Sequence, residues 1–183
     1  MKKIFLVLLA FGLLQSAHAQ FGVRAGYSSA NFEDTNFRNK SGFHVGGYYR
    51  ADVGFFSIEP GLQFAQKGYE TNDGQSGAKI DEKLSYVDVP VLFRLNFLPS
   101  LNVFAGPQGS ILVSRKYTDG TDTNTSTEII RGYDIAGVVG LGVSLPWGIN
   151  AQASYDFGLT SLNYFDTNVN NRVFKLSVGW DFY

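Results

Sequence analysis

The fold is decided by the stretch YVDVPVLFRLNF, residues 86–97. Its odd-numbered positions are all apolar, whereas its even-numbered positions include Asp88, Arg94 and Asn96. Successive side chains of a β-strand point to opposite faces, so this alternation predicts a strand with one apolar face and one polar face. A strand that separates lipid from a polar interior has this pattern.

The same period-two alternation occurs in further segments of the chain. They cover residues 21–28, 42–52, 55–67, 101–114, 134–145, 149–159 and 174–182. Segment 101–114 is the least regular, because Pro107 and Gly109 lie in its middle, where they predict a bulge or bend. About eight strands of this length are enough to span a bilayer and to close into a barrel.

The connections between these segments alternate between short and long. Tight turns are expected at residues 53–54, 98–100 and 146–148, and long polar loops at 31–40, 68–81, 116–132 and 160–171. Outer-membrane barrels have short periplasmic turns, long extracellular loops and an even strand count. The sheet must close, because an unpaired strand edge in hydrocarbon leaves backbone groups unsatisfied. The sequence therefore predicts an all-β fold, an eight-stranded antiparallel up-and-down transmembrane β-barrel.

The N-terminal residues have the pattern of a secretory signal peptide. Lys2 and Lys3 are followed by the apolar run 4–14 and by the cleavage pattern Ala17-His18-Ala19. The apolar run is shorter than the ~20 residues that a membrane-spanning helix needs. We expect residues 1–19 to be a signal peptide and residues 20–183 to form the barrel domain, exported to the bacterial outer membrane.

Composition excludes several function classes. Only 17% of the residues are charged, against about 25% in soluble domains. Removing Lys2 and Lys3 with the signal peptide lowers the formal net charge from −1 to −3, which argues against nucleic acid as a partner. The absence of cysteine excludes disulfides, a thiol nucleophile and a lipidated cysteine.

The polar faces of the predicted strands carry equal numbers of basic and acidic residues. We expect a structural polar network inside the barrel, made of Arg24, His44, Arg50, Glu59, Lys67, Asp88, Arg94, Asp134, Asp156, Lys175 and Asp181. Isolated buried charges are costly, so near-balance indicates internal salt bridges. An eight-stranded interior is just wide enough for side chains to fill, which favours this interpretation over a selective pore or a proton path.

Aromatic residues near the ends of the predicted strands are expected to form girdles at the lipid headgroups. They are Tyr27, Tyr49, Phe55, Tyr86, Phe97, Tyr155 and Trp180. Intrinsic β-propensity accounts for the same residues equally well.

Catalytic chemistry has little support in the sequence. His44 is the only histidine left after signal cleavage, and Ser28 or Ser29 could be imagined as its nucleophile, but no third group that would orient the histidine is evident. Segment 119–128 is rich in oxygen ligands that could attract calcium, but it does not match the EF-hand pattern. We therefore predict no catalytic, cofactor-binding or metal-binding residues, and no enzyme.

Four motifs carry a resemblance to a known family. They are GVRAG at 22–26, IEPGLQ at 58–63, YVDVPVL at 86–92 and AGP at 105–107. Together they resemble the PorT-type outer-membrane β-barrel family of the Bacteroidota. The resemblance implies an eight-stranded barrel with a role linked to protein secretion across the outer membrane, and it carries over no catalytic residues.

The leading hypothesis is a non-catalytic outer-membrane barrel that acts as an anchor or displays its four long loops, beside a secretion or transport complex. Its expected partners are outer-membrane lipid and the barrel-assembly machinery, although Tyr183 ends the chain out of phase with Trp180 and Phe182. A small channel is one alternative. A secreted soluble ligand-binding barrel of the lipocalin kind, with its apolar faces turned inward, is another.

Overall fold

The computed structural model describes residues 18–32, 38–72, 79–119, 122–124, 132–160, 162–164, 167–169 and 171–182. The long elements are strands β1 (His18–Phe32), β2 (Arg38–Val53), β3 (Phe56–Asn72), β4 (Lys79–Leu98), β5 (Leu101–Asp119), β7 (Tyr133–Ser144), β8 (Ile149–Gly158) and β11 (Asn171–Phe182). The short elements are strands β6 (Asp122–Asn124), β9 (Leu162–Tyr164) and β10 (Thr167–Val169) and the 3₁₀ turn η1 (Pro146–Gly148). Within the described ranges, no helix has the length and apolar composition needed to cross a membrane.

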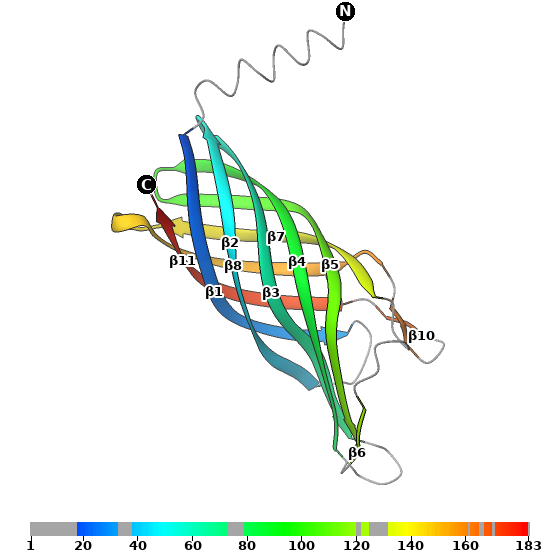
Figure 1. The fold of residues 1–183 in the computed structure, drawn as a ribbon. Helices are drawn as coiled ribbons and strands as arrows, with labels where there is room; N and C mark the ends of the chain where they lie inside the picture. Colours follow the sequence, from blue (N-terminus) through cyan, green and yellow to red (C-terminus); the bar gives the residue numbers. More distant parts are fainter. Residues whose placement is uncertain are drawn as a thin grey trace, which may run out of the picture.

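The long strands form a closed antiparallel barrel (Figure 1). Their order is β4-β3-β2-β1-β11-β8-β7-β5, and a further pairing of β4 with β5 closes the sheet. The first and last strands pair along the whole of β11, from Phe21 opposite Phe182 to Phe32 opposite Asn171. The predicted eight-stranded up-and-down barrel is therefore confirmed. Strand β1 begins at His18, just before the predicted cleavage point, and the signal peptide itself remains a prediction.

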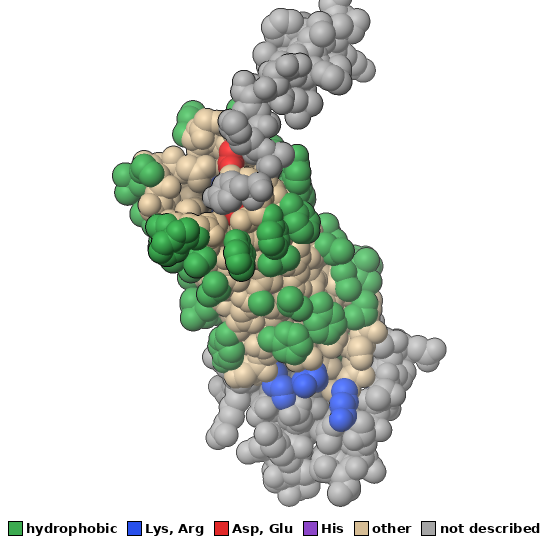
Figure 2. Space-filling model, turned by 60° about the vertical axis from the view of Figure 1, so that its left-hand side comes forward, with side chains coloured by type: hydrophobic (Ala, Val, Ile, Leu, Met, Phe, Trp, Pro, Cys, Tyr) green, Lys and Arg blue, Asp and Glu red, His purple; other side chains and the backbone are tan. Residues whose placement is uncertain are grey.

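The apolar face of the barrel wall points outward. Val89, Phe93 and Leu176 are 44%, 43% and 49% exposed, whereas Asp88 and Arg94 are buried at 0% and 2%. The space-filling view shows an apolar belt of hydrophobic side chains across the visible face of the barrel (Figure 2). This arrangement is the reverse of a soluble ligand-binding barrel, whose apolar side chains line its centre.

Strands extend farther than predicted at the end of the barrel opposite the short turns, including β1 and β2, which take up parts of the predicted loop 31–40, and most of all β3, β4 and β5. β3 continues to Asn72, β4 already begins at Lys79, and β5 runs to Asp119. Parts of the predicted loops 68–81 and 116–132 are therefore strand, and the predicted loop 160–171 contains the small hairpin of β9 and β10. The remainder of these loops, including most of the calcium candidate 119–128, lies outside the described residues.

The predicted bulge at Pro107 and Gly109 is wrong. Pairing of β4 with β5 has the same register on both sides of Pro107. The register shifts instead between Ser85 and Tyr86 and between Asn96 and Leu98. Proline lacks the N–H of a ladder bond. That loss locally interrupts the pairing without adding a residue to either strand.

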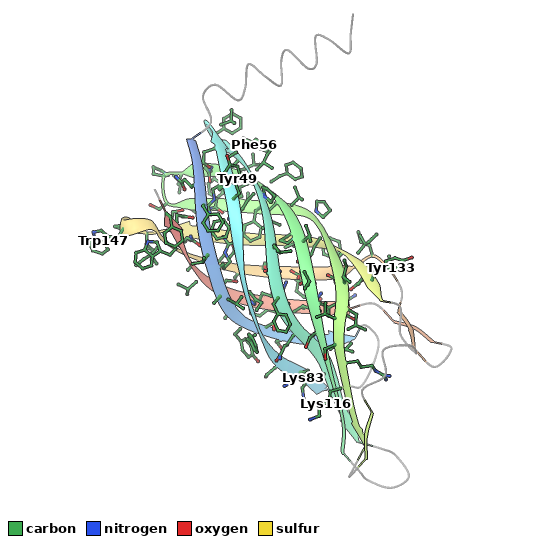
Figure 3. All side chains as sticks on the ribbon, in the orientation of Figure 1. Tyr49, Phe56, Lys83, Lys116, Tyr133 and Trp147 are labelled. Atoms are coloured by element: carbon green, nitrogen blue, oxygen red, sulfur yellow. The ribbon has the colours of Figure 1, made fainter. Side chains whose placement is uncertain are left out.

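The short turns and several exposed aromatic residues lie together at one end of the barrel. Trp147 in η1 has a positive φ of 65° and is 86% exposed, and Phe55 in the turn between β2 and β3 is 74% exposed. Figure 3 shows Trp147, Tyr49 and Phe56 at this end. Exposed aromatics at such a level suit the headgroup region. Tyr86 was wrongly assigned to the girdle, because it points inward and is 0% exposed.

Two glycines on the inner face make room for large inward side chains. A Cβ atom at Gly22 would overlap the Tyr48 ring, and one at Gly140 would overlap the Phe104 ring. At the outward-facing Gly109 a Cβ would meet nothing within 4 Å. The small residues therefore allow ring-sized groups to fill a narrow interior.

Replacing Gly22 with Ala is expected to lower the free energy of unfolding by about 1–3 kcal/mol, the usual cost of overpacking. The methyl group would push Tyr48 away from its hydrogen-bond partners. Urea titration of the barrel in phospholipid vesicles measures the change, with Gly109→Ala as the matched control. Equal stabilities of the two variants would show that the ring does not need this space.

Candidate functional site

The inner face of the barrel brings charged side chains from most strands into contact. Those nearest the short turns are named here the Glu59 cluster, which consists of Arg24, Tyr48, Arg50, Glu59, Arg94, Asn150 and Asp181. All of its members are buried. Each lies at an inward position of its strand, so the period-two pattern of the sequence directs it into the lumen.

Glu59, on β3, binds three arginines that come from three different strands. Its Oε1 accepts hydrogen bonds from Arg24 Nη1 on β1 at 2.9 Å and from Arg94 Nη2 on β4 at 2.7 Å. Its Oε2 accepts from Arg50 Nε on β2 at 2.8 Å. A single carboxylate, 1% exposed, therefore ties four neighbouring strands together.

Asp181 provides the second carboxylate of the Glu59 cluster. Tyr48 donates its hydroxyl to Asp181 Oδ1 at 2.6 Å, and Arg50 and Asn150 both donate to Oδ2 at 3.1 Å. Arg24 also stacks over the Tyr48 ring, with its guanidinium carbon 4.1 Å from the ring centroid. These contacts link β11 and β8 to β2 across the lumen.

Charged side chains farther from the short turns form the Asp88 cluster, which consists of Lys67, Asp88, Gln108, Ser110, Asp156 and Lys175. Lys67 and Lys175 approach Asp88 at 3.2 Å and 3.5 Å, and Lys175 also binds Asp156 at 2.6 Å. Two ammonium groups and two carboxylates balance each other in this layer. Balanced pairing offsets the cost of burying charge.

Two residues from the predicted network lie apart from these clusters. His44 Nε2 lies 2.8 Å from Ser177 Oγ on β11, and the histidine is 2% exposed. Asp134 accepts a hydrogen bond from the Thr160 hydroxyl at 2.7 Å. Ser28, the imagined nucleophile, donates to the backbone carbonyl of Gln66 instead of meeting His44. Among the described residues, no group of histidine and acidic side chains is arranged to hold a metal ion.

The lumen opens into a pocket at the turn end and is narrow beside the Glu59 cluster. A polar pocket of about 600 Å³ lies at the turn end and is lined in part by Asp52, Asn96 and Ser144. Arg50, Arg94 and Asp181 of the Glu59 cluster also line this pocket. Beyond them lies a cavity of only about 20 Å³ beside Glu59 and Gln63, which has room for about one water molecule. The geometry thus provides a periplasmic vestibule above a layer of paired charges.

Several network residues were missed in the sequence analysis. Tyr48 and Asn150 complete the Glu59 cluster, Gln152 accepts from Arg94 at 2.7 Å, and Gln108 lies within the Asp88 cluster. All of them occupy inward positions of predicted strands. An inward phase combined with a long polar side chain is the signal that would have found them.

The outward apolar belt and the charge-filled lumen define a transmembrane β-barrel of the bacterial outer membrane. Residues 14–164 match the model of the family described as outer membrane protein beta-barrel domain, and the chain belongs to that family. Comparison with curated protein sequences gives no significant match.

Solved structures of outer-membrane barrels share the fold. Neisserial surface protein A superimposes with a TM-score of 0.63 at 14% identity, covering 90% of this chain and 99% of that one. Ail of Yersinia pestis gives a TM-score of 0.56 at 16% identity, with the same coverage. A major outer membrane protein from Thermus thermophilus gives 0.55 at 16% identity, again covering 90% and 99%. At these identities the likeness concerns the fold alone.

Proposed function

We propose that this protein is a non-catalytic, non-conducting outer-membrane barrel whose role is to anchor and display its long connections outside the cell. The observation that carries the proposal is the layer of buried ion pairs around Glu59, which fills the lumen beyond the vestibule. Long polar connections at the far end of the barrel are consistent with recognition at the cell surface.

The absence of catalysis is part of this proposal. His44 is buried against Ser177 inside the barrel, where the Glu59 cluster separates it from the vestibule. The network residues are proposed to be structural, because each charge has an oppositely charged or hydrogen-bonding neighbour.

The four sequence motifs favour the PorT-type branch of barrel proteins, and with it a position beside a secretion or transport complex. Insertion by the barrel-assembly machinery is the route we propose for the chain, with the outward Trp180 and Phe182 of β11 as its C-terminal signal. We propose the secretion or transport complex and the barrel-assembly machinery as partners because of the class of protein, and no contact of the described residues enters that argument.

Planar-bilayer recordings test the closed lumen. The refolded protein is expected to give no stable conductance steps, because the Glu59 cluster leaves room for about one water molecule beside it. A general porin inserted in the same chamber is the positive control. Reproducible steps from the wild-type protein would overturn the proposal and favour the small channel, for which the vestibule of about 600 Å³ would then be the entrance.

A further inference from the structure

Exposed charge on the described surface of the barrel is entirely basic. Among residues with described side chains, every Asp and Glu other than the half-buried Asp52 is buried, whereas Lys83, Lys116 and Arg172 are exposed. Figure 2 shows basic side chains at the end of the apolar belt that is farthest from the short turns. This end faces the outer leaflet, because the short turns are periplasmic.

Lys83 and Lys116 lie directly opposite each other in neighbouring strands. They are register partners on β4 and β5, and Figure 3 shows both side chains at the same margin of the barrel. Like charges placed directly opposite each other destabilise a sheet. Neither ammonium has an acidic partner among the described side chains, so this part of the protein gives the pair no counter-charge.

From the two lysines toward the short turns, the outward face changes in one step from polar to apolar. The next outward rung joins Gln66, Ser85 and Ser114 of three adjacent strands, and the rung after it pairs the apolar residues Val87 and Ile111. Two cations, a rung of hydrogen-bonding groups and then an apolar wall follow one another across the strands. That order matches the headgroup, glycerol and acyl regions of a phosphorylated lipid.

We infer that Lys83 and Lys116 form a binding site for the phosphate group of an outer-leaflet lipid, whose acyl chains lie along the apolar wall of β4 and β5. The lipid phosphate supplies the counter-charge that the described side chains do not. An ammonium and a phosphate attract each other strongly at the margin of the hydrocarbon, where water is scarce. The Ser114 hydroxyl and the Gln66 amide are placed to hydrogen-bond the linkage below the phosphate.

Native mass spectrometry of the full chain in detergent measures the binding of the first lipid molecule. The probes are phosphatidic acid, which carries a phosphate monoester, and phosphatidylcholine with the same acyl chains. The double variant K83Q/K116Q is expected to weaken the first phosphatidic acid by about 25-fold, because each basic residue at a charged lipid surface contributes about fivefold. Binding of phosphatidylcholine is expected to change little.

Two controls separate this site from general attraction to the barrel. K83R/K116R keeps both charges and is expected to keep the affinity, and R172Q removes one exposed charge from β11, a strand that pairs with neither β4 nor β5. The inference fails if K83Q/K116Q binds phosphatidic acid like the wild type, or if R172Q weakens it as much. Displacement of the lipid by a tenfold excess of inorganic phosphate would also overturn it, because a free anion and not a lipid would then be the ligand.

Discussion

Replacing Glu59 with Gln is expected to lower the free energy of unfolding by about 3–5 kcal/mol, the usual cost of removing one partner from a buried ion pair. Glu59 is the one carboxylate that Arg24, Arg50 and Arg94 share, and it is 1% exposed. The amide is close in shape to the carboxylate but carries no charge. Three guanidinium groups would then share Asp181 as their only carboxylate in the Glu59 cluster.

Urea titration of the variant in phospholipid vesicles measures this loss, and the exposed Ser114→Ala variant provides the baseline. Adding Arg24→Leu to Glu59→Gln is expected to recover part of the stability, because it removes one of the uncompensated cations. A Glu59→Gln barrel as stable as the wild type would mean that water and backbone groups already satisfy the arginines. The proposed structural role of the network would then be lost.

The faces of the strands could be predicted from the sequence because each strand is in contact with lipid on one side and with the lumen on the other. In β4, Val89 and Phe93 are outward, and Asp88 and Arg94 are inward, as the alternation of residues 86–97 predicts. The signal is local, since it depends only on neighbouring residues and on a period of two. A closed barrel then follows, because hydrocarbon does not tolerate an open edge.

The strand ends could not be predicted in the same way. Beyond Ser85 the next outward residue of β4 is the exposed Lys83, which lies outside the apolar belt, where a charged residue is as suitable as an apolar one. Alternation of hydrophobicity therefore ends before the strand does. The predicted loops 68–81 and 116–132 began where that signal stopped, while the hydrogen-bonded ladder continued.

The partners inside the lumen are the other part that sequence could not provide. Equal numbers of basic and acidic residues suggested ion pairs, but Arg24 and Arg94 reach Glu59 only because of the register and curvature of the closed sheet. Such contacts join residues 35 positions apart. Tyr86 was assigned to the aromatic girdle because it lies near a predicted strand end, although its even-numbered position in the strand predicts an inward side chain. Its ring in fact lies inside the barrel, 4.6 Å from the Lys67 ammonium.

Replacing Val178 with Arg is expected to destabilise the folded barrel by about 2–4 kcal/mol, the cost of a basic side chain facing lipid near the bilayer midplane. Val178 is 62% exposed, and it lies on β11 between the outward residues Leu176 and Trp180. The same substitution at Ser114, on the outer margin of the belt, should cost only about 0–1 kcal/mol, because the penalty falls steeply toward the interface.

The native sequence already has an arginine on the outward row of β11 that contains Val178. This residue, Arg172, is exposed and lies beyond the apolar residues of the row. Urea titration in vesicles gives both free energies of unfolding, and the difference between Val178→Arg and Ser114→Arg isolates the effect of membrane depth. If the two variants lost equal stability, the belt would not be immersed in hydrocarbon. An outward apolar surface of this size would then need a protein partner to cover it, because water does not stabilise so large an apolar patch.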